Sequence, residues 1–203
     1  MSEKEKMLSE QIYDVSDPEL TILRKNAHML CQKYNLLFEN ETDKRTKILD
    51  SLLPNKGKNA YLQGPIYFDY GVFTEIGENF YSNFNLTILD CAKVIIGNNV
   101  LIGPNVSIVT PIHPLRYQER NFRTKKDGSL YNYEYAKPIS IGDNCWIASN
   151  VTIIGGVQIG NGCVIGAGSV VSKSIPDFSL AVGNPCTPIR KITDKDIIDI
   201  PKI

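Results

Sequence analysis

The sequence predicts an all-β fold, a parallel β-helix of triangular cross-section, preceded by a small α-helical segment. Three observations predict it. An aliphatic residue returns every six positions along much of the chain, a Gly or small polar residue usually follows it, and the helical spacing of apolar residues is confined to residues 5–53. A period of six fits neither an α-helix nor a hairpin meander. It fits a strand and a corner, repeated so that three faces complete a turn in about 18 residues.

Residues 5–53 are predicted to be helical. Asp17 is a capping residue followed by Pro18 at the first helical position, and apolar residues then recur at helical spacing as far as Tyr34. A second stretch begins at about Thr42 and stops at Pro54, because proline cannot continue a helix. Both helices have one apolar face, so we expect them to pack against the remainder of the chain.

The six-residue repeats follow a polar linker at residues 55–59. The same frame appears around residues 96 and 102, and more loosely at residue 76. We expect the aliphatic residue to point into the prism and the small residue after it to let the backbone turn the corner. Cys145 and Cys163 have the same phase and should stack in neighbouring coils as core-filling residues. In the clearest run the repeated position is held by Ile141, Ile147, Ile153, Ile159, Ile165 and Val171.

Length and composition exclude several classes of function. A chain of 203 residues buries one core, with room for an appendage. Lys plus Arg equal Asp plus Glu at 22 each, so no overall field attracts the protein to nucleic acid or to an anionic membrane. A charged N-terminus and the absence of an apolar run of transmembrane length predict a cytoplasmic protein.

The five cysteines form no C-x-x-C pair, which argues against a disulfide framework or a thiolate zinc site.

The repeats over residues 76–108 and 141–175 resemble the left-handed β-helix acyltransferases. Further segments resemble the maltose and galactoside O-acetyltransferases within that class, so that the resemblance covers nearly the whole chain. The resemblance implies a left-handed coil, acetyl-CoA as co-substrate, a sugar hydroxyl as acceptor, and a homotrimer with active sites between subunits. The further segments are Ile12-Tyr13-Asp14 with Asp17-Pro18-Glu19-Leu20, Phe68-Asp69-Tyr70-Gly71 with residues 76–90, and residues 165–173 with 183–186 and 189–191.

Repeats and resemblance together divide the chain into three parts. Residues 1–58 form an N-terminal helical segment that we expect to cap the acceptor site. Residues 59–190 form the β-helix acetyltransferase domain, with a loop inserted at about residues 109–138. Residues 191–203 form a C-terminal tail.

The inserted loop opens with His113, one of two histidines in the chain; the other is His28. A long irregular insertion into a regular fold is typical of a functional site. The resemblance implies that His113 is the general base, which removes the proton of the attacking hydroxyl. Because the thioester is already activated, we predict direct transfer in a ternary complex, without an acetyl-enzyme. A backbone N–H at or near Ser149 is the expected oxyanion donor.

The resemblance assigns the other candidate residues. Asn83 is expected to fix the reacting groups, and Glu134 to accept a hydrogen bond from the second imidazole nitrogen, although a solvated loop carboxylate is an alternative for Glu134. Cys91 stands where galactoside-type members have Asp, and Thr187 where some members have Arg. Asp14, Asp69 and Asn83 match acceptor-contacting positions, and Trp146, Ser149, Ala167, Ser172, Lys173 and Arg190 match CoA-contacting positions.

Three alternative functions compete with this one. A metal-dependent enzyme of the γ-carbonic anhydrase type needs three histidines per metal, and the β-helix supplies only His113, so we expect no metal. A non-catalytic binding or scaffold module does not account for His113, Asn83, Trp146 and Lys173 together. An antibiotic- or other small-molecule-modifying acetyltransferase shares the fold, CoA and a loop histidine. It stays open, although the N-terminal segment with Asp14 favours the sugar.

Overall fold

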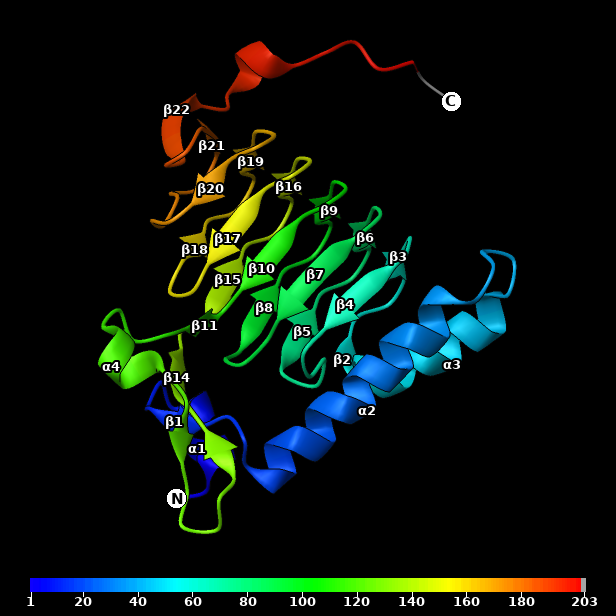
Figure 1. Ribbon diagram of the computed structural model, residues 1–203. Helices are drawn as coiled ribbons and strands as arrows, with labels where there is room; N and C mark the ends of the chain where they lie inside the picture. The colour runs from blue at the N-terminus through cyan, green and yellow to red at the C-terminus, as the bar shows by residue number, and fades with distance from the viewer. Residues whose placement is uncertain (202–203) are drawn as a thin grey trace.

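The computed structural model describes residues 1–201 of the chain (Figure 1). The body is a left-handed parallel β-helix of about 6 turns with a short helical region at its N-terminal end, which confirms the predicted fold class. Figure 1 shows the long helix α2 lying across the first coils, the inserted loop leaving the middle of the stack, and the C-terminal tail leaving its far end.

Three sheets form the faces of the prism, and each of the first five coils contributes a strand to each face. The seven-stranded sheet contains, in spatial order, β3 (Tyr61–Leu62), β6 (Tyr81–Ser82), β9 (Leu101–Ile102), β16 (Trp146–Ile147), β19 (Val164–Ile165), β21 (Ser179–Val182) and the antiparallel β22 (Thr187–Lys191). The second face, here called the β4 sheet, contains β4 (Ile66–Phe68), β7 (Leu86–Leu89), β10 (Ser107–Val109), β17 (Thr152–Ile154) and β20 (Val170–Val171). The third, the β2 sheet, contains β2 (Asn55–Lys56), β5 (Thr74–Ile76), β8 (Val94–Ile96), β15 (Ile139–Ile141) and β18 (Gln158–Ile159).

The repeated aliphatic residues form the core, as the six-residue period predicts. Those at residues 141, 147, 153, 159, 165 and 171 are all between 0% and 2% exposed. Equivalent residues pair between coils, for example Ile102 with Ile147 and Ile147 with Ile165. Cys145 and Cys163 are buried and reduced, and each precedes a paired residue of neighbouring strands, so they stack as expected. Each buried aliphatic side chain contributes about 1.5–3 kcal/mol to stability.

The corners carry asparagine ladders and close-packed glycines. Asn79, Asn99 and Asn144 have φ angles of 56°, 55° and 58°, a left-handed conformation that Asn tolerates better than most residues. Their side-chain amides bond from coil to coil, at 3.0 Å between Asn79 and Asn99 and 3.1 Å between Asn99 and Asn144. At Gly77, a Cβ would lie 2.6 Å from the carbonyl carbon of Gly97. Only glycine therefore fits this corner at the observed coil spacing.

The N-terminal segment is only partly helical, so the prediction of helix over residues 5–53 is wrong for residues 9–17. There the strand β1 (Tyr13–Asp14) pairs antiparallel with β14 (Tyr133–Ala136) of the inserted loop. Long-range pairing and the burial of Tyr13 override the local helical pattern. The helices are α1 (Glu3–Leu8), α2 (Pro18–Asn35), α3 (Thr42–Leu52) and α4 (Tyr117–Arg120).

Helix α2 begins as the sequence predicts, and α3 ties the segment to the first coil. The Asp17 carboxylate accepts from the backbone N–H of Glu19 at 3.0 Å, which satisfies a free donor of the first turn. Arg45 of α3 is buried, and its guanidinium donates to the Leu62 carbonyl at 2.6 Å and lies 4.7 Å from the ring centroid of Tyr34. The two helices thereby close the open end of the β-helix.

The inserted loop leaves the stack after Thr110 and returns at Lys137, whose backbone N–H donates to the Thr110 carbonyl at 3.0 Å. Within the loop, β14 pairs on one side with β1 and on the other with β11. The loop is thus anchored to the β-helix and to the N-terminal segment. Besides α4 and β14, it contains β11 (Pro111–Ile112) and a hairpin of β12 (Arg123–Thr124) and β13 (Leu130–Tyr131).

The tail continues from β22 into a 3₁₀ turn, η1 (Asp194–Asp196). The last two residues of the predicted tail, 202 and 203, lie outside the described residues. Over residues 1–201, no helix combines the length and the apolar character needed to cross a membrane.

Candidate active site

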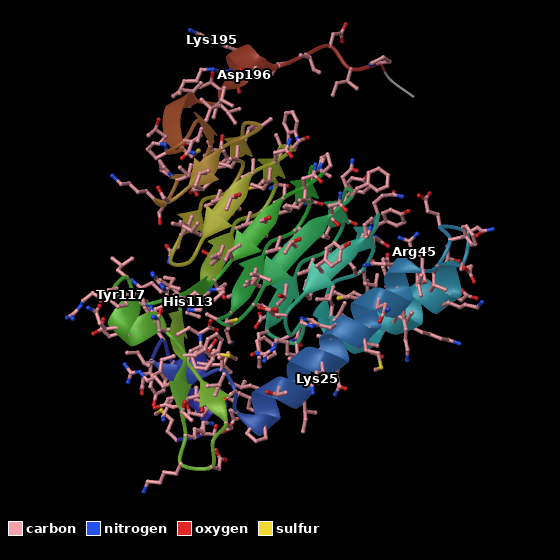
Figure 2. All side chains as sticks on the ribbon, viewed as in Figure 1. Lys25, Arg45, His113, Tyr117, Lys195 and Asp196 are labelled. Carbon is pink, nitrogen blue, oxygen red and sulfur yellow. The ribbon has the colours of Figure 1, made fainter. Side chains whose placement is uncertain are left out.

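One corner of the prism gathers several of the predicted site residues. Asp69 follows β4, Cys91 lies shortly after β7, and His113 follows β10 and β11. The strands of the β4 sheet are parallel, so the residues after them meet at the same edge. Figure 2 shows His113 at the start of the inserted loop, close to α4. We call this edge the His113 corner.

Glu134 of β14 lies beside His113. Their closest atoms, Nε2 and Oε2, are 3.8 Å apart, an ion-pair distance that is too long for a hydrogen bond. The His113 side chain is 50% exposed and that of Glu134 only 12%. The hydroxyl of the buried Tyr13 donates to the other carboxylate oxygen, Oε1. Glu134 therefore faces both the imidazole and the protein interior, and it is not a solvated loop residue.

Burial controls the protonation of Glu134. Burial raises the pKa of the carboxyl, while the hydrogen bond from Tyr13 and the nearby His113 lower it, and the net shift is upward. The carboxylate lies within ion-pair distance of the imidazole, and burial strengthens the attraction between opposite charges at such a distance. The pair can accept a proton on the imidazole and hold the resulting charge.

Asp69 joins Cys91 to a histidine of α2. The Cys91 thiol donates to Oδ2 of Asp69 at 3.5 Å, and Nε2 of His28 lies 3.5 Å from Oδ1. Burial raises the pKa of the Cys91 thiol far above its ordinary value. Since the thiolate is the nucleophilic form, Cys91 acts here as a hydrogen-bond donor and not as a nucleophile.

Asp14 is engaged with the inserted loop. Nζ of Lys125 lies 2.7 Å from Oδ2, and the Ser16 hydroxyl donates to Oδ1 at 2.7 Å. Burial would raise the pKa of Asp14, but these bonds outweigh it and the pKa is lowered. Asp14 also lies directly opposite Tyr133 in the pairing of β1 with β14, one position from Glu134. Successive residues of a strand point to opposite faces, so Asp14 is a carboxylate on the face opposite to Tyr13 and Glu134.

A second corner holds Asn83 and two of the cofactor candidates. Asn83 follows β6, Ser149 lies shortly after β16, and Ala167 lies shortly after β19, so the three share the edge where the seven-stranded sheet meets the β4 sheet. We call it the Asn83 corner. Each strand of the β4 sheet starts near the Asn83 corner and ends near the His113 corner. Within a single chain, Asn83 and His113 therefore lie apart: Asn83 is at the edge where the strands of the β4 sheet begin, and His113 is at the edge where they end.

The remaining cofactor candidates are dispersed. Trp146 is 52% exposed on the seven-stranded sheet. Ser172 and Lys173 are exposed and follow β20, in the last coils. Arg190 of β22 is bound by both carboxylate oxygens of Asp196, at 2.8 and 2.6 Å. No single surface of one chain unites all the predicted CoA contacts.

Sequence reasoning missed four side chains of the site: Tyr13, His28, Cys91 as a donor, and Lys125. Of these four, only Tyr13 and Cys91 could have been found from the sequence, because they lie in or beside segments that match the family pattern. The contacts of His28 and Lys125 depend on how α2 and the loop pack, which no local pattern specifies. Within residues 1–201, no group of three or more His, Cys, Asp or Glu side chains is arranged to hold a metal ion.

Comparisons with protein families match most of the chain. Residues 6–57 match the maltose acetyltransferase hexapeptide capping motif. Residues 138–173 match the bacterial transferase hexapeptide of six repeats, and residues 93–113 match the hexapeptide repeat of succinyl-transferase. The helical segment and the coils on both sides of the loop are thus each recognised independently.

Individual relatives are similar along most of their length. The galactoside O-acetyltransferase of Escherichia coli K12 is 43% identical over 173 residues, which is 85% of this chain and 81% of that protein. The crystal structure of a maltose O-acetyltransferase from Clostridium difficile 630 superposes with a TM-score of 0.88 at 43% identity, covering 96% of this chain and 99% of the other. A galactoside acetyltransferase in complex with coenzyme A gives a TM-score of 0.88 at 39% identity, covering 97% and 94%. The chain therefore belongs to the maltose and galactoside O-acetyltransferase family of hexapeptide-repeat enzymes.

Proposed function

We propose that the protein transfers an acetyl group from acetyl-CoA to a sugar hydroxyl, with His113 as general base. The observation that carries the proposal is the pairing of a half-exposed imidazole with the buried Glu134 at 3.8 Å, at the start of the inserted loop. The sugar is supported by the galactoside and maltose acetyltransferases among the relatives, and acetyl-CoA by the relative solved with coenzyme A.

The chemistry follows from the contacts of His113. The imidazole removes the proton of the sugar hydroxyl as its oxygen attacks the thioester carbonyl, and Glu134 stabilises the imidazolium that forms. The collapsing intermediate expels the CoA thiolate, which recovers the proton from His113. Because the thioester is already activated, the hydroxyl attacks it directly in a ternary complex, without an acetyl-enzyme. The buried Cys91 serves as a hydrogen-bond donor to Asp69 in this mechanism.

Residues 1–58 act as a cap for the acceptor. Asp69 lies in the His113 corner and Asp14 on the neighbouring strand β1, and the side-chain oxygens of Asp accept hydrogen bonds from sugar hydroxyls. In the Asn83 corner, the small Ala167 leaves room for the pantetheine chain. Lys173 and Arg190 supply cations for the phosphates of CoA, which then compete with Asp196 for Arg190.

The active unit is a homotrimer. The outer face of the seven-stranded sheet carries an apolar ladder of six residues. The outward positions of the β4 sheet are divided between a polar row, Thr87, Ser107 and Thr152, and a shorter apolar row, Leu89, Val109 and Ile154. Trp146 and Leu101 of this ladder are 52% and 50% exposed, and a contiguous apolar surface of this kind is typical of an interface. The ladder consists of Tyr61, Tyr81, Leu101, Trp146, Val164 and Leu180, paired in register from coil to coil.

A neighbouring copy completes the site. The apolar ladder runs directly into the Asn83 corner, so a copy packed against it by its His113 corner brings the two corners together. A repeated contact of this head-to-tail kind closes into a ring when the rotation is one third of a turn. Asn83 and the backbone N–H at or near Ser149 then come from one subunit and His113 from the next.

The test is the release of CoA thiol from acetyl-CoA with a panel of sugars, amino acids and antibiotics. We expect sugars alone to stimulate release, and His113→Ala to lower kcat by about 10²-fold or more, as for removal of a general base. Gln118→Ala, on the exposed face of α4, is the control and should retain the activity. Stimulation by an antibiotic alone would contradict the sugar acceptor, and an unchanged His113→Ala variant would contradict the mechanism.

A further inference from the structure

A cavity of about 230 Å³ lies between the turn that joins α2 to α3 and the first two coils of the β-helix. We call it the Arg45 cavity. Figure 2 shows Arg45 and His113 on opposite sides of the molecule, so the cavity is separate from the His113 corner of the same chain. Its volume is below the usual range for drug-sized ligands and suits a smaller molecule. The residues that form its walls include Tyr34, Leu37, Glu39, Arg45, Gln63 and Phe84.

Arg45 brings a buried cation to this cavity. Its side chain is only 5% exposed, and a guanidinium keeps its charge at every pH that proteins meet. Within residues 1–201 its hydrogen bonds all start from Nη2, which donates to the Tyr34 hydroxyl at 2.7 Å and to the carbonyls of Leu62 and Gln63 at 2.6 and 3.2 Å. Nε and Nη1 therefore keep their donors free.

No carboxylate neutralises this cation. The ion pairs of residues 1–201 do not include Arg45. Glu39 lies in the wall of the cavity, but its carboxylate accepts from the side-chain amide of Gln63. A buried charge without a counter-ion is costly, and an anion bound in the cavity would offset that cost.

The charges of the Arg45 cavity favour a carboxylate over other anions. Nε and Nη1 of a guanidinium form a fork that matches the two oxygens of a carboxylate. The cavity supplies one cation, and the carboxylate of Glu39 lies in the same wall. A phosphate dianion would leave a negative charge without a partner beside Glu39, whereas a carboxylate carries a single charge.

The rest of the cavity wall is largely apolar. Leu37, Phe38, Pro65 and Phe84 contribute to it, and the rings of Phe38 and Phe84 are 77% and 48% exposed. Burial of apolar surface against such rings adds affinity for a ligand that has an apolar part. The cavity therefore matches a small molecule with one carboxylate and a compact apolar body.

We propose that the Arg45 cavity binds a small organic carboxylate, whose oxygens accept from Nε and Nη1 of Arg45 and whose apolar part lies against Phe38 and Phe84. The inference is independent of the reaction at His113. The bound molecule joins the turn between α2 and α3 to the first coils. Because it binds only the folded protein, it stabilises the N-terminal segment on the β-helix in proportion to its concentration.

The experiment is calorimetric titration of the wild type with benzoate, together with its thermal unfolding. Benzamide is the neutral analogue and inorganic phosphate the other anion. We expect benzoate to bind and to raise Tm by about 2 °C or more near saturation. Benzamide should bind at least about tenfold more weakly, because the charge-assisted pair is lost. Phosphate should also bind more weakly than benzoate.

Four variants locate the site. Leu37→Trp fills the apolar part of the Arg45 cavity and should abolish benzoate binding, whereas Leu36→Trp, at an adjacent exposed position outside the cavity, is the matched control. Arg45→Lys keeps the charge but lacks the fork, so we expect binding about tenfold weaker. Glu39→Gln removes a negative charge from the wall and should tighten binding by about two- to fivefold.

The outcomes decide the ligand and the place separately. Equal affinities for benzoate and benzamide, or tighter binding of phosphate, overturn the carboxylate. Undetectable benzoate binding to the wild type, or equal weakening in Leu36→Trp and Leu37→Trp, overturns the cavity as the site. If Arg45→Lys does not fold, the two tryptophan variants and Glu39→Gln decide, and weaker binding in Glu39→Gln overturns recognition of the charge.

Discussion

Tyr13 supports Glu134 from the side opposite to His113. Its side chain is fully buried and its hydroxyl donates to Oε1, while the imidazole faces Oε2. A buried carboxylate that loses a donor becomes harder to ionise. Because Tyr13 acts through Glu134, it is a positioning residue.

We expect Tyr13→Phe to move the acidic limb of the pH profile of kcat/KM to higher pH. Burial already raises the pKa of Glu134, and loss of the Tyr13 hydrogen bond lets that pKa rise further. At a given low pH more of Glu134 is then protonated and less can support the imidazolium. One hydrogen bond corresponds to a shift of about 0.5–1 pH unit. Tyr117→Phe, in the exposed part of α4, is the control; a shift to lower pH would contradict the assigned role of Tyr13.

The sequence identified part of this residue set. It singled out His113 and Glu134, and the structure brings the two side chains together. It missed Tyr13 because the helical spacing over residues 5–53 concealed β1. That strand has only two residues and depends on a partner more than a hundred positions away in the chain. Local patterns cannot specify a contact of this range.

At the scale of the elements, the close approach of successive corners fixes the spacing of the coils. A Cβ added to Gly77 would lie 2.6 Å from the carbonyl carbon and oxygen of Gly97, and rigid backbone of the next coil cannot move aside cheaply. The strain would fall on the hydrogen bonds between β5 and β8, which end at this corner.

Gly77→Ala is therefore expected to lower the free energy of unfolding by about 1–3 kcal/mol, the usual cost of overpacking. Urea denaturation at fixed protein concentration measures the change. Glu78→Ala changes an exposed side chain at the same corner and should leave the midpoint near that of the wild type. Equal midpoints for the two variants would show that the coils can separate without cost.

The coils were predictable and the inserted loop was not, for a physical reason. Each coil repeats the same local pattern. The burial of residues such as Ile153 and Ile159 can therefore be predicted from their place in the repeat alone. The loop is held by pairing of β14 with β1 and β11 and by the contact of Lys125 with Asp14. None of these contacts repeats, so only the presence and place of an insertion could be expected.

For the whole molecule, the proposed site makes activity depend on assembly, because one chain keeps Asn83 and His113 apart. Leu101 lies in the middle of the apolar ladder, between Tyr81 and Trp146. A carboxylate at this position would be buried without a partner in the proposed interface, which is costly. The ladder is the surface through which a second copy would complete each site.

We expect Leu101→Glu to dissociate the trimer and to abolish sugar acetylation together. Light scattering measures the assembly, and Gln158→Glu on the exposed face of the β2 sheet is the control that should remain trimeric. Asn83→Ala and His113→Ala chains, each impaired alone, should regain activity when refolded together, because some sites then combine intact residues from two subunits. A fully active monomer, or no recovery on mixing, would argue against shared sites.

The hydrogen bond between Lys137 and Thr110 closes the inserted loop at its base. Asn85 and Asn105 lie in neighbouring coils, 20 positions apart in the sequence, and their side-chain amides are 2.9 Å apart. Asn105 and Asn150 are 45 positions apart because the loop lies between them, yet their side-chain amides are still only 3.1 Å apart. The stack therefore keeps its register regardless of how much chain is inserted at this point. An inserted loop of another length or composition between Thr110 and Lys137 is therefore compatible with the same stacking of the coils on either side.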